Sequence, residues 1–197
     1  LEKFLTSVSD DMSEYEKELA LHDALLNTLI YDNAAAADSA NDPFAFTAYG
    51  ALVNGTAVCE GYSRAFQLLM RCVGIECTLA TGSSKEQGHM WNKVKIGGEW
   101  YNVDTTWNDD DAYVFHTYFN ITDSMIEIDH SVHPDYSTLS SEQLEQFEDF
   151  NIALPACTSL QSNYGTINGS YISSREDFAE VTADELEKSA KSGISGA

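Results

Sequence analysis

The sequence predicts a mixed fold in which helices pack against antiparallel strands. Two amphipathic segments have helical spacing, one behind a capping signal at Ser13 and one beginning near Cys59. Between them and the C-terminus, two strand-like segments flank Gly97-Gly98, which is typical of a two-residue hairpin turn. With 197 residues, 43% of them hydrophobic, the chain is long enough for one domain with a substantial core.

The first helix is expected at residues 14–30. Ser13 followed by Glu16 forms a capping box, which marks the start of a helix. Behind it one helical stripe carries Tyr15, Leu19, His22, Leu26 and Leu29. Residues 32–43 are rich in Asn, Asp and small side chains and are expected to form a loop, followed by a short helical piece at 44–52.

The second helix is expected to begin at or near Cys59. Asn54-Gly55 marks a turn just before it, and Gly74 is a suitable residue just past its end. Its apolar face consists of Ala65, Phe66, Leu69, Met70 and Val73. A strand at 76–81 and a Gly/Ser loop at 82–88 are expected to follow.

The next two strands are expected at 89–96 and 99–106. If Gly97-Gly98 is a two-residue turn, Ile96 faces Glu99, and successive side chains alternate between the two faces of the hairpin. One face then carries His89, Trp91, Trp100, Asn102 and Asp104, and the other, core-like face carries Met90, Val94, Ile96, Tyr101 and Val103. His89 and Asp104 become diagonal neighbours, roughly 7–8 Å apart between backbones. We expect the Cys59 helix to lie over this face.

The remaining segments carry weaker signals. They predict an acidic loop at 108–111, a strand at 113–122, a helix at 140–150, a second hairpin at Asn168-Gly169 and a last helix from Ser174 to about 191.

These placements predict a nucleophilic site. A thiol at a helix N-terminus, beside an imidazole that a carboxylate orients, can carry out acyl transfer. Cys59 would attack a carbonyl carbon, His89 would protonate the leaving amine and then activate the acceptor, and Asp104 would orient His89. The backbone N–H of Cys59 is a natural oxyanion donor, and Asn54 is a candidate for a second donor. Trp91 is the candidate for a wall of the substrate site.

Three sequence blocks resemble those of bacterial transglutaminase-like superfamily proteins. CEGY at 59–62, with Gly74-Ile75 after it, resembles their nucleophile block; HMWNKV at 89–94 resembles their His block, and WYNVDTTW at 100–107 their Asp block. The order and the short spacings also match. The only departure inside these blocks is Met90, where Ala is usual. Softer matches lie at 22–23 and 31–32 upstream, and at 118–123 with His130 downstream.

The resemblance implies an α+β fold with a papain-like/transglutaminase core, in which the nucleophile helix packs on an antiparallel β-sheet. It implies a single transglutaminase-like domain over 1–197, with the motif core at about 54–107 and a C-terminal extension at 155–197. The implied activity is cysteine-dependent acyl transfer or hydrolysis at amide bonds of proteins or peptides, of the peptidase, amidase or transglutaminase type. The alternative is a catalytically silent binding or scaffolding module at the cell surface, although decayed members commonly lose one of the three site residues.

No cofactor and no metal are expected. The run 109–111 lacks the ligand spacing of an EF-hand calcium loop. The histidines and aspartates of the next segment match no standard metal pattern; they are His116, Asp129, His130, His133 and Asp135. Four cysteines without a CxxC are too few for a disulfide scaffold, and pairing of Cys72 with Cys77 stays open.

The charge balance limits the partners. A formal net charge of -22 repels nucleic acid and anionic lipid. The family resemblance implies a protein or peptide substrate, with cell-wall peptides among the candidates. No apolar run approaches the roughly 20 residues of a membrane helix. Because the chain starts at Leu1, we expect a processed or cloned fragment. The acidic balance and the lack of nucleic-acid features favour a protein that is extracellular or attached to the cell surface. The oligomeric state is left open.

Overall fold

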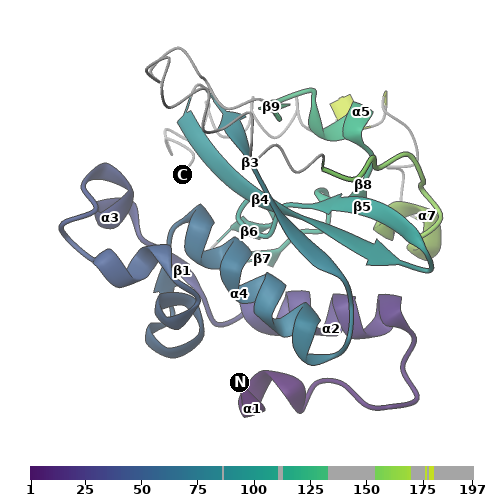
Figure 1. Cartoon of the computed structure of the whole chain (residues 1–197), viewed down its shortest axis with the longest axis horizontal. Coiled ribbons are helices and arrows are strands. Elements are labelled where there is room, and N and C mark those ends of the chain that lie inside the picture. The colour runs from purple at the N-terminus through teal and green to yellow at the C-terminus, as the bar shows by residue number, and fades with distance from the viewer. Residues whose placement is uncertain (86, 111–112, 133–153, 170–175, 177, 180–197) are drawn as a thin grey trace.

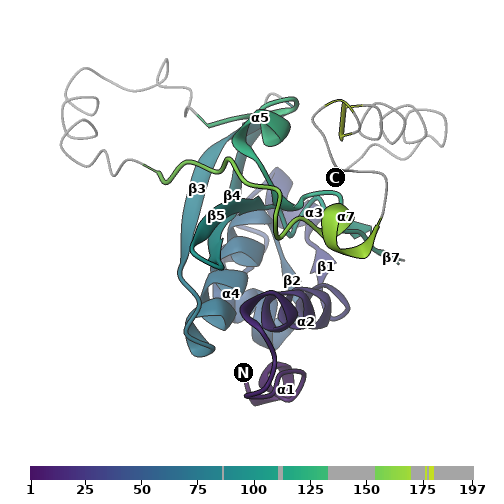
Figure 2. The same cartoon turned by 90° about the vertical axis from the view of Figure 1, so that its right-hand side faces the viewer.

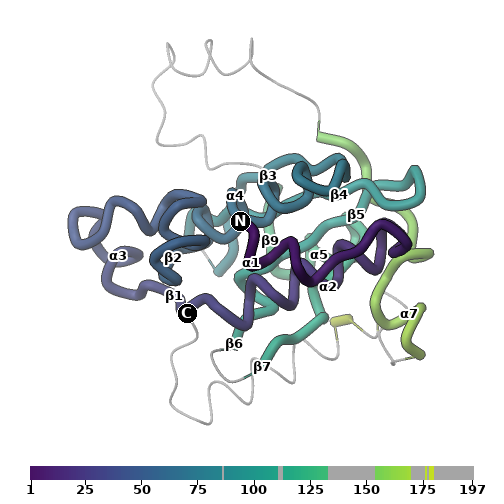
Figure 3. The backbone as a smooth tube through the Cα atoms, turned by 90° about the horizontal axis from the view of Figure 1, so that it is seen from below, coloured from purple at the N-terminus to yellow at the C-terminus, as the bar shows by residue number. Residues whose placement is uncertain are grey.

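The computed structural model describes residues 1–85, 87–110, 113–132, 154–169, 176 and 178–179 (Figure 1). The helix expected at 140–150 lies outside these residues, as do His133 and Asp135. Of the helix expected at 174–191, only 176, 178 and 179 are described, and they are helical. Within the described residues, no helix is both long enough and apolar enough to span a membrane. Seen from below, α3 and α7 lie at opposite ends of the molecule (Figure 3).

The N-terminal part contains α1 (Glu2–Leu5) and α2 (Glu14–Leu26). The capping box is present: the Ser13 hydroxyl accepts the Glu16 N–H at 3.3 Å, and the Glu16 carboxylate accepts the Ser13 N–H at 2.8 Å. The helix is four residues shorter than expected because the chain turns and enters β1 (Ile30–Tyr31), which pairs in parallel with β2 (Thr56–Ala57).

Between β1 and β2 the chain forms three short helical turns. The prediction of a loop at 32–43 is wrong in part, because α3 (Asn33–Ala37) forms there. The Asp32 side chain caps it by accepting the Ala35 N–H, and the alanines that follow are strong helix formers. The helical piece expected at 44–52 is divided into the 3-10 turn η1 (Pro43–Phe46) and the π-helical turn η2 (Gly50–Asn54).

Helix α4 (Cys59–Cys72) begins and ends where the sequence indicates. Val58 before it is extended, and Gly74 after it has φ +78°, a left-handed conformation that suits glycine. The predicted apolar face is buried at Ala65, Phe66, Leu69 and Met70.

The central sheet has the strand order β8-β5-β4-β3-β9, and its paired strands are antiparallel. Its strands are β3 (Cys77–Ser84), β4 (Gln87–Ile96), β5 (Glu99–Val103), β8 (Phe119–Ile121) and β9 (His130–Ser131). The predicted hairpin register is confirmed, since Ile96 pairs with Glu99 and Val94 with Tyr101. The loop expected at 82–88 is wrong: β3 and β4 stay paired as far as Ser84 opposite Gln87, because their ladder continues through the Gly/Ser segment.

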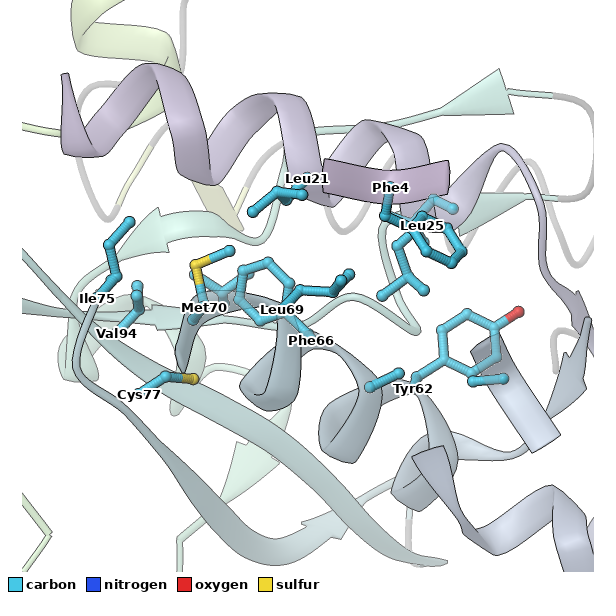
Figure 4. Close-up of a cluster of buried hydrophobic side chains, with 14 of the residues drawn as sticks. Phe4, Leu21, Leu25, Tyr62, Phe66, Leu69, Met70, Ile75, Cys77 and Val94 are labelled. Atoms are coloured by element: carbon cyan, nitrogen blue, oxygen red, sulfur yellow. The ribbon is translucent and has the colours of Figure 1, made fainter. Parts of the chain in front are cut away.

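Helix α4 packs on the apolar face of the hairpin, not on the face that carries His89 as expected. Its buried side chains join Val94, Ile96, Tyr101 and Val103 in one core cluster, and α2 closes that cluster from the other side of α4 (Figure 4). Asn92, on the same face as Val94, donates to the Ser63 carbonyl of α4 at 3.0 Å. The apolar stripe of a helix must meet an apolar surface, and the face with His89 and Asp104 is too polar for that.

The opposite face of the sheet is covered by the chain after β5. Trp91 packs there with Tyr118, Ile121 and the short helix α5 (Asp123–Ile126), which lies away from α4 (Figure 2). Buried Lys93 fastens the later chain to this face, because its ammonium lies 2.8 Å from Asp123 Oδ1 and donates to the Pro155 carbonyl at 2.8 Å.

Two other local predictions are corrected. The acidic loop at 108–111 and the strand at 113–122 are instead a small ribbon of β6 (Asp109–Asp110) and β7 (Tyr113–Val114), with β8 as a separate strand. Asn168-Gly169 is not a hairpin turn. It ends α7 (Tyr164–Asn168), and Gly169 takes the left-handed φ of +69° that closes a helix.

Candidate active site

Cys59 lies at the N-terminus of α4 and is half-buried. Its thiol opens into a small pocket between the end of the helix, the β3–β4 turn and the segment after β5. The pocket is lined by Tyr31, Cys59, Ser84, Lys85, Gln87, Gly88, His89, Thr106 and Trp107. The helix N-terminus therefore meets the end of the hairpin, although the body of α4 packs on the other face of the sheet.

His89 connects Cys59 to Asp104. Its Nε2 atom lies 2.6 Å from Oδ2 of Asp104, and its ring also forms a hydrogen bond with the Cys59 side chain. Because Asp104 occupies Nε2, the Nδ1 atom is the one left for the thiol. The three residues that the sequence singles out are thus adjacent, in the order thiol, imidazole and carboxylate.

The His89 imidazole is protonated at neutral pH. Burial alone lowers the pKa of His89, but the charge of Asp104, its hydrogen bond and the adjacent Cys59 outweigh burial and raise that pKa to about 10. The pocket therefore presents a thiol beside an imidazolium, which is the arrangement that stabilises a thiolate.

Asp104 is fully buried but well supplied with hydrogen bonds. Its Oδ1 atom accepts the backbone N–H groups of Thr106 and Trp107 at 2.9 and 3.0 Å, and its Oδ2 atom contacts His89 and also His130. Burial raises the pKa of Asp104, but the charge of His89 and the hydrogen bond from His130 outweigh burial and hold that pKa well below its usual range. The carboxylate is therefore ionised and fixed in orientation.

His130 is the component of the site that sequence reasoning missed. Its Nε2 atom lies 2.9 Å from Asp104 Oδ2, and its Nδ1 atom lies 2.5 Å from Asp129 Oδ1. The sequence assigned no site role to His130 and placed it among several histidines without a metal pattern. The available signal was its softer downstream match to the family blocks.

Trp91 was expected to form a wall of the substrate site, but Trp107 lines the pocket in its place. Trp91 is fully buried and is not among the pocket-lining residues; its ring is stacked 6.2 Å from the His89 ring, and its Nε1–H donates to Asn102. It supports His89 from beneath. Trp107 lines the pocket instead, and the Lys85 ammonium lies 3.9 Å from the centroid of its ring.

Asn54, the candidate second oxyanion donor, lies elsewhere. It is exposed at the end of η2 and is not among the residues that line the pocket. The group that meets the Cys59 backbone N–H is the Tyr31 hydroxyl, which accepts a hydrogen bond from it. Burial, and then the neighbouring Cys59 and Asp104, raise the pKa of Tyr31 to about 12, so the hydroxyl keeps its proton.

Two groups in the described residues have side-chain atoms close enough to share a metal ion: His22, Asp23 and His116, and His89, Asp104 and His130. In the first group Asn108 decides the protonation. Its Oδ1 accepts the Tyr118 N–H, so its Nδ2 faces His22 Nε2 at 3.1 Å, and the His22 proton must sit on Nδ1, pointing at Asp23. The protonated Nδ1 of His22 has no lone pair for a metal ion. The His22, Asp23 and His116 side chains therefore form a hydrogen-bonded link between α2 and the segment before β8.

The buried cysteines contact groups other than an imidazole in the described residues: Cys77 accepts from Asn92, and Cys157 donates to the Pro155 carbonyl. The four cysteines are all free, so Cys72 and Cys77 are not joined; Cys72 is exposed and Cys77 is buried.

In the segment that was expected to be an acidic loop, the Asp109 carboxylate accepts a hydrogen bond from the Tyr62 hydroxyl.

A helix with a cysteine at its N-terminus packs on an antiparallel sheet, and a His from β4 and an Asp directly after β5 meet that cysteine. This arrangement defines an α+β domain with a papain-like/transglutaminase core. The family model described as the transglutaminase-like superfamily matches residues 3–105, which include Cys59, His89 and Asp104. The chain belongs to the transglutaminase-like superfamily.

Individual relatives match only part of the chain. The kyphoscoliosis peptidase of Homo sapiens is 31% identical over 116 residues, which are 51% of this chain and 17% of that protein. Among solved structures, a transglutaminase has 21% identity and a TM-score of 0.45, covering 49% of this chain and 27% of its own. A proposed cysteine protease from Cytophaga hutchinsonii has 19% identity and a TM-score of 0.43, covering 58% of this chain and 37% of its own. The chain spans about a sixth of the length of the human relative.

Proposed function

We propose that this protein catalyses cysteine-dependent acyl transfer or hydrolysis at amide bonds of proteins or peptides, with Cys59, His89 and Asp104 as its catalytic residues. One observation carries the proposal: Cys59 shares a pocket with an imidazolium that Asp104 holds at 2.6 Å. Thiol, imidazole and carboxylate in this order form a nucleophile, an acid–base group and its orienter.

In the first half-reaction the Cys59 thiolate attacks the carbonyl carbon of the amide. A C–S bond forms, and the carbonyl oxygen becomes an oxyanion that the backbone N–H of Cys59 can stabilise. In the free protein the Tyr31 hydroxyl accepts a hydrogen bond from this N–H. The oxyanion must therefore replace the Tyr31 hydroxyl as the acceptor. His89 then delivers its proton to the nitrogen as the C–N bond breaks, the amine leaves, and a thioester remains on Cys59.

In the second half-reaction an acceptor releases the acyl group. His89, now neutral, takes a proton from water or from an amine while that acceptor attacks the thioester carbon, and the thiolate of Cys59 departs. Water as acceptor gives a peptidase or amidase, and an amine gives a transglutaminase. The human relative is named a peptidase, which favours water.

The proposal includes the kind of partner and the location. The net charge of -22 favours a protein or peptide substrate over nucleic acid, with cell-wall peptides among the candidates and a place outside the cell or at its surface. The alternative of a silent binding module is less favoured, because the hydrogen bonds that connect Cys59, His89 and Asp104 are intact.

The test is alkylation of the folded protein with iodoacetamide across a pH series, in a Cys72→Ser background that removes the exposed thiol. Cys59 should react faster than a free model thiol below pH about 8. The reaction should disappear in Cys59→Ala, and its pH profile should shift in His89→Ala. A Cys59 that reacts no faster than the model thiol, or not at all, would rule the proposal out.

The acceptor is identified separately. A peptide library is incubated with and without a primary amine, and the products are analysed by mass spectrometry. New carboxyl termini or deamidated side chains in both samples support hydrolysis. Incorporation of the amine supports transamidation, and no product in either sample favours the binding module.

A further inference from the structure

Asp104 is shared between two imidazoles. The same oxygen, Oδ2, lies 2.6 Å from Nε2 of His89 and 2.9 Å from Nε2 of His130. The two rings lie 5.2 Å apart between centroids, and the His130 side chain is completely buried. Neither Asp104 nor His130 is among the residues that line the pocket.

The contacts of His130 determine its protonation. Nε2 faces Asp104 Oδ2, and Nδ1 faces Asp129 Oδ1 at 2.5 Å. Both carboxylates are supplied with other donors: Asp104 accepts two backbone N–H groups, and Asp129 accepts the Tyr118 hydroxyl at 2.5 Å. A ring nitrogen that faces a carboxylate oxygen at hydrogen-bonding distance must carry a proton, so both nitrogens do, and the ring is an imidazolium.

The groups packed around His130 agree with this charge. The titratable groups that face it are the His89 imidazole from β4, the Asp104 carboxyl after β5, the Tyr118 hydroxyl before β8 and the Asp129 carboxyl before β9. Lys85, at the β3–β4 turn, interacts with Asp129 from outside. Burial lowers the pKa of His130, but the hydrogen bonds and charges of Asp104 and Asp129 outweigh burial and raise it.

We propose that His130 is a positively charged positioning residue of the Cys59–His89–Asp104 site. Its Nε2–H holds Asp104 in the orientation that bonds His89, and its charge adds positive potential that favours the thiolate of Cys59. This role rests on the proposed function and deepens it, because it makes the pH at which Cys59 becomes reactive depend on a residue outside the pocket. His130 does not touch the pocket and acts through Asp104.

The fold holds His130 in this place independently of the substrate. His130 lies in the two-residue edge strand β9 and pairs with Ser84 of β3, whose hydroxyl also donates to the Asp129 carbonyl at 3.1 Å. The rings of Trp91, Trp107 and Tyr118 surround it at 5.3–5.6 Å between centroids.

The first experiment measures the charge directly. In protein labelled with 15N-histidine, the ring nitrogens of His130 are assigned by loss of their signals in His130→Gln. Both nitrogens should be protonated at pH 7, and both N–H groups should exchange slowly with solvent. A neutral His130 ring with one unprotonated nitrogen at pH 7 overturns the inference, whatever the activity of the protein.

The second experiment separates charge from orientation through the pH profile of Cys59 alkylation in the Cys72→Ser background. His130→Gln keeps a donor for Asp104 but loses the charge, and His130→Phe keeps the ring but loses both. The rising part of the profile at low pH, the acid limb, should shift to higher pH by about one unit in both variants. The limiting rate should be nearly preserved in Gln and fall about tenfold or more in Phe, because Asp104 is no longer held.

His116→Gln is the matched control. His116 also donates to an aspartate, with Nε2 2.8 Å from Asp23 Oδ1, but outside the pocket, so its profile should match the parent. If the His130 variants match the parent in both limb and limiting rate, the inference fails while the proposed function stands. If the parent itself shows no activated Cys59, the proposed function fails, and the 15N measurement on the unaltered protein still decides the charge of His130.

Discussion

The Nε2 atom of His89 lies 2.6 Å from Oδ2 of Asp104, between the two strands of one hairpin. This contact depends on the register of β4 and β5, which begins with Ile96 opposite Glu99. Gly97 and Gly98 both have positive φ, as a tight primed turn requires, so the register is set locally. A one-residue slip would move either His89 or Asp104 to the other face of the sheet.

The first prediction concerns the pH at which His89 loses its proton. Because the pKa of His89 is raised to about 10, the imidazolium persists through neutral pH and is lost only as the pH rises through about 10. Asp104→Asn removes the carboxylate that raises this pKa. The pH at which the His89 ring loses its proton, followed in 15N-histidine spectra, should therefore fall well below 10.

The control for this prediction is Asp10→Asn, which removes one negative charge from an exposed N-terminal position. It should leave the titration of His89 in place. A His89 ring that still loses its proton near pH 10 in Asp104→Asn would mean that this carboxylate does not raise the pKa of His89.

The second prediction concerns Glu18, which is fully buried in α2. Asn120 donates to its Oε2 at 2.7 Å, but its Oε1 has no hydrogen-bond partner among the described residues. Burial raises the pKa of Glu18 from 4.5 to about 8. A carboxyl with a raised pKa stabilises the fold fully below about pH 4.5, and this contribution is lost as the pH rises through 8. Glu18→Gln cannot ionise and should be more stable than the parent at pH 9.

This prediction is measured by urea unfolding at several pH values. The difference in free energy of unfolding between Glu18→Gln and the parent should grow from pH 5 to pH 9, whereas exposed Glu127→Gln should show a flat difference. A flat difference for Glu18→Gln as well would show that Glu18 is not protonated in the folded state.

The third prediction compares two lysines of β4. Lys93 is 3% exposed and bonds both Asp123 and the Pro155 carbonyl, whereas Lys95 is 34% exposed and pairs with Glu76. Lys93→Ala removes a donor from the Pro155 carbonyl and the cation that pairs with Asp123, and it should cost about 3 kcal/mol in unfolding free energy. Lys95→Ala should cost less than about 1 kcal/mol. Equal costs in urea unfolding would contradict the anchoring role of Lys93.

The fourth prediction concerns the close approach of β9 to β3. A Cβ atom on Gly82 would collide with the Ser131 carbonyl oxygen, whereas a Cβ on Gly88 would meet nothing within 4 Å. Gly82→Ala should therefore push β9 off the sheet edge and lower the melting temperature by several degrees, about 2 kcal/mol or more. Gly88→Ala should leave the melting temperature nearly unchanged, and a similar loss in both variants would argue against the collision.

Gly82→Ala has a further consequence for the site. Because His130 lies in β9, its hydrogen bond to Asp104 should weaken together with the pairing of β3 and β9. In 15N-histidine spectra the ring N–H groups of His130 should exchange faster with solvent than in the parent, while those of His116 stay unchanged. Unchanged exchange at His130 would show that the edge strand does not hold it.

Several features were predictable because they depend on neighbouring residues. The Ser13–Glu16 box starts α2, Gly74 closes α4, and Gly97-Gly98 sets the hairpin register. These signals act over a few residues, where capping and turn geometry dominate. The same local reading was wrong at Asn168-Gly169, because that dipeptide suits the end of a helix as well as a hairpin turn.

Other features depended on which segments pack against each face of the sheet. The sequence placed α4 over the polar face of the hairpin, but its apolar stripe requires the face with Val94 and Tyr101. Trp91 was expected in the pocket wall, yet the chain after β5 buries it. The register tells which side chains share a face, but not which later segment covers that face.

The sequence by itself determined the superfamily blocks, the start of α4 at Cys59 and the hairpin that pairs His89 with Asp104. Only the tertiary structure decided that Tyr31 meets the Cys59 N–H and that His130 completes the hydrogen bonding of Asp104. The physical reason is the separation in sequence between the residues that interact. Helix caps and two-residue turns act between near neighbours, whereas His130 and Tyr31 reach the site because an edge strand and a crossing segment pack there, and no local pattern encodes that packing.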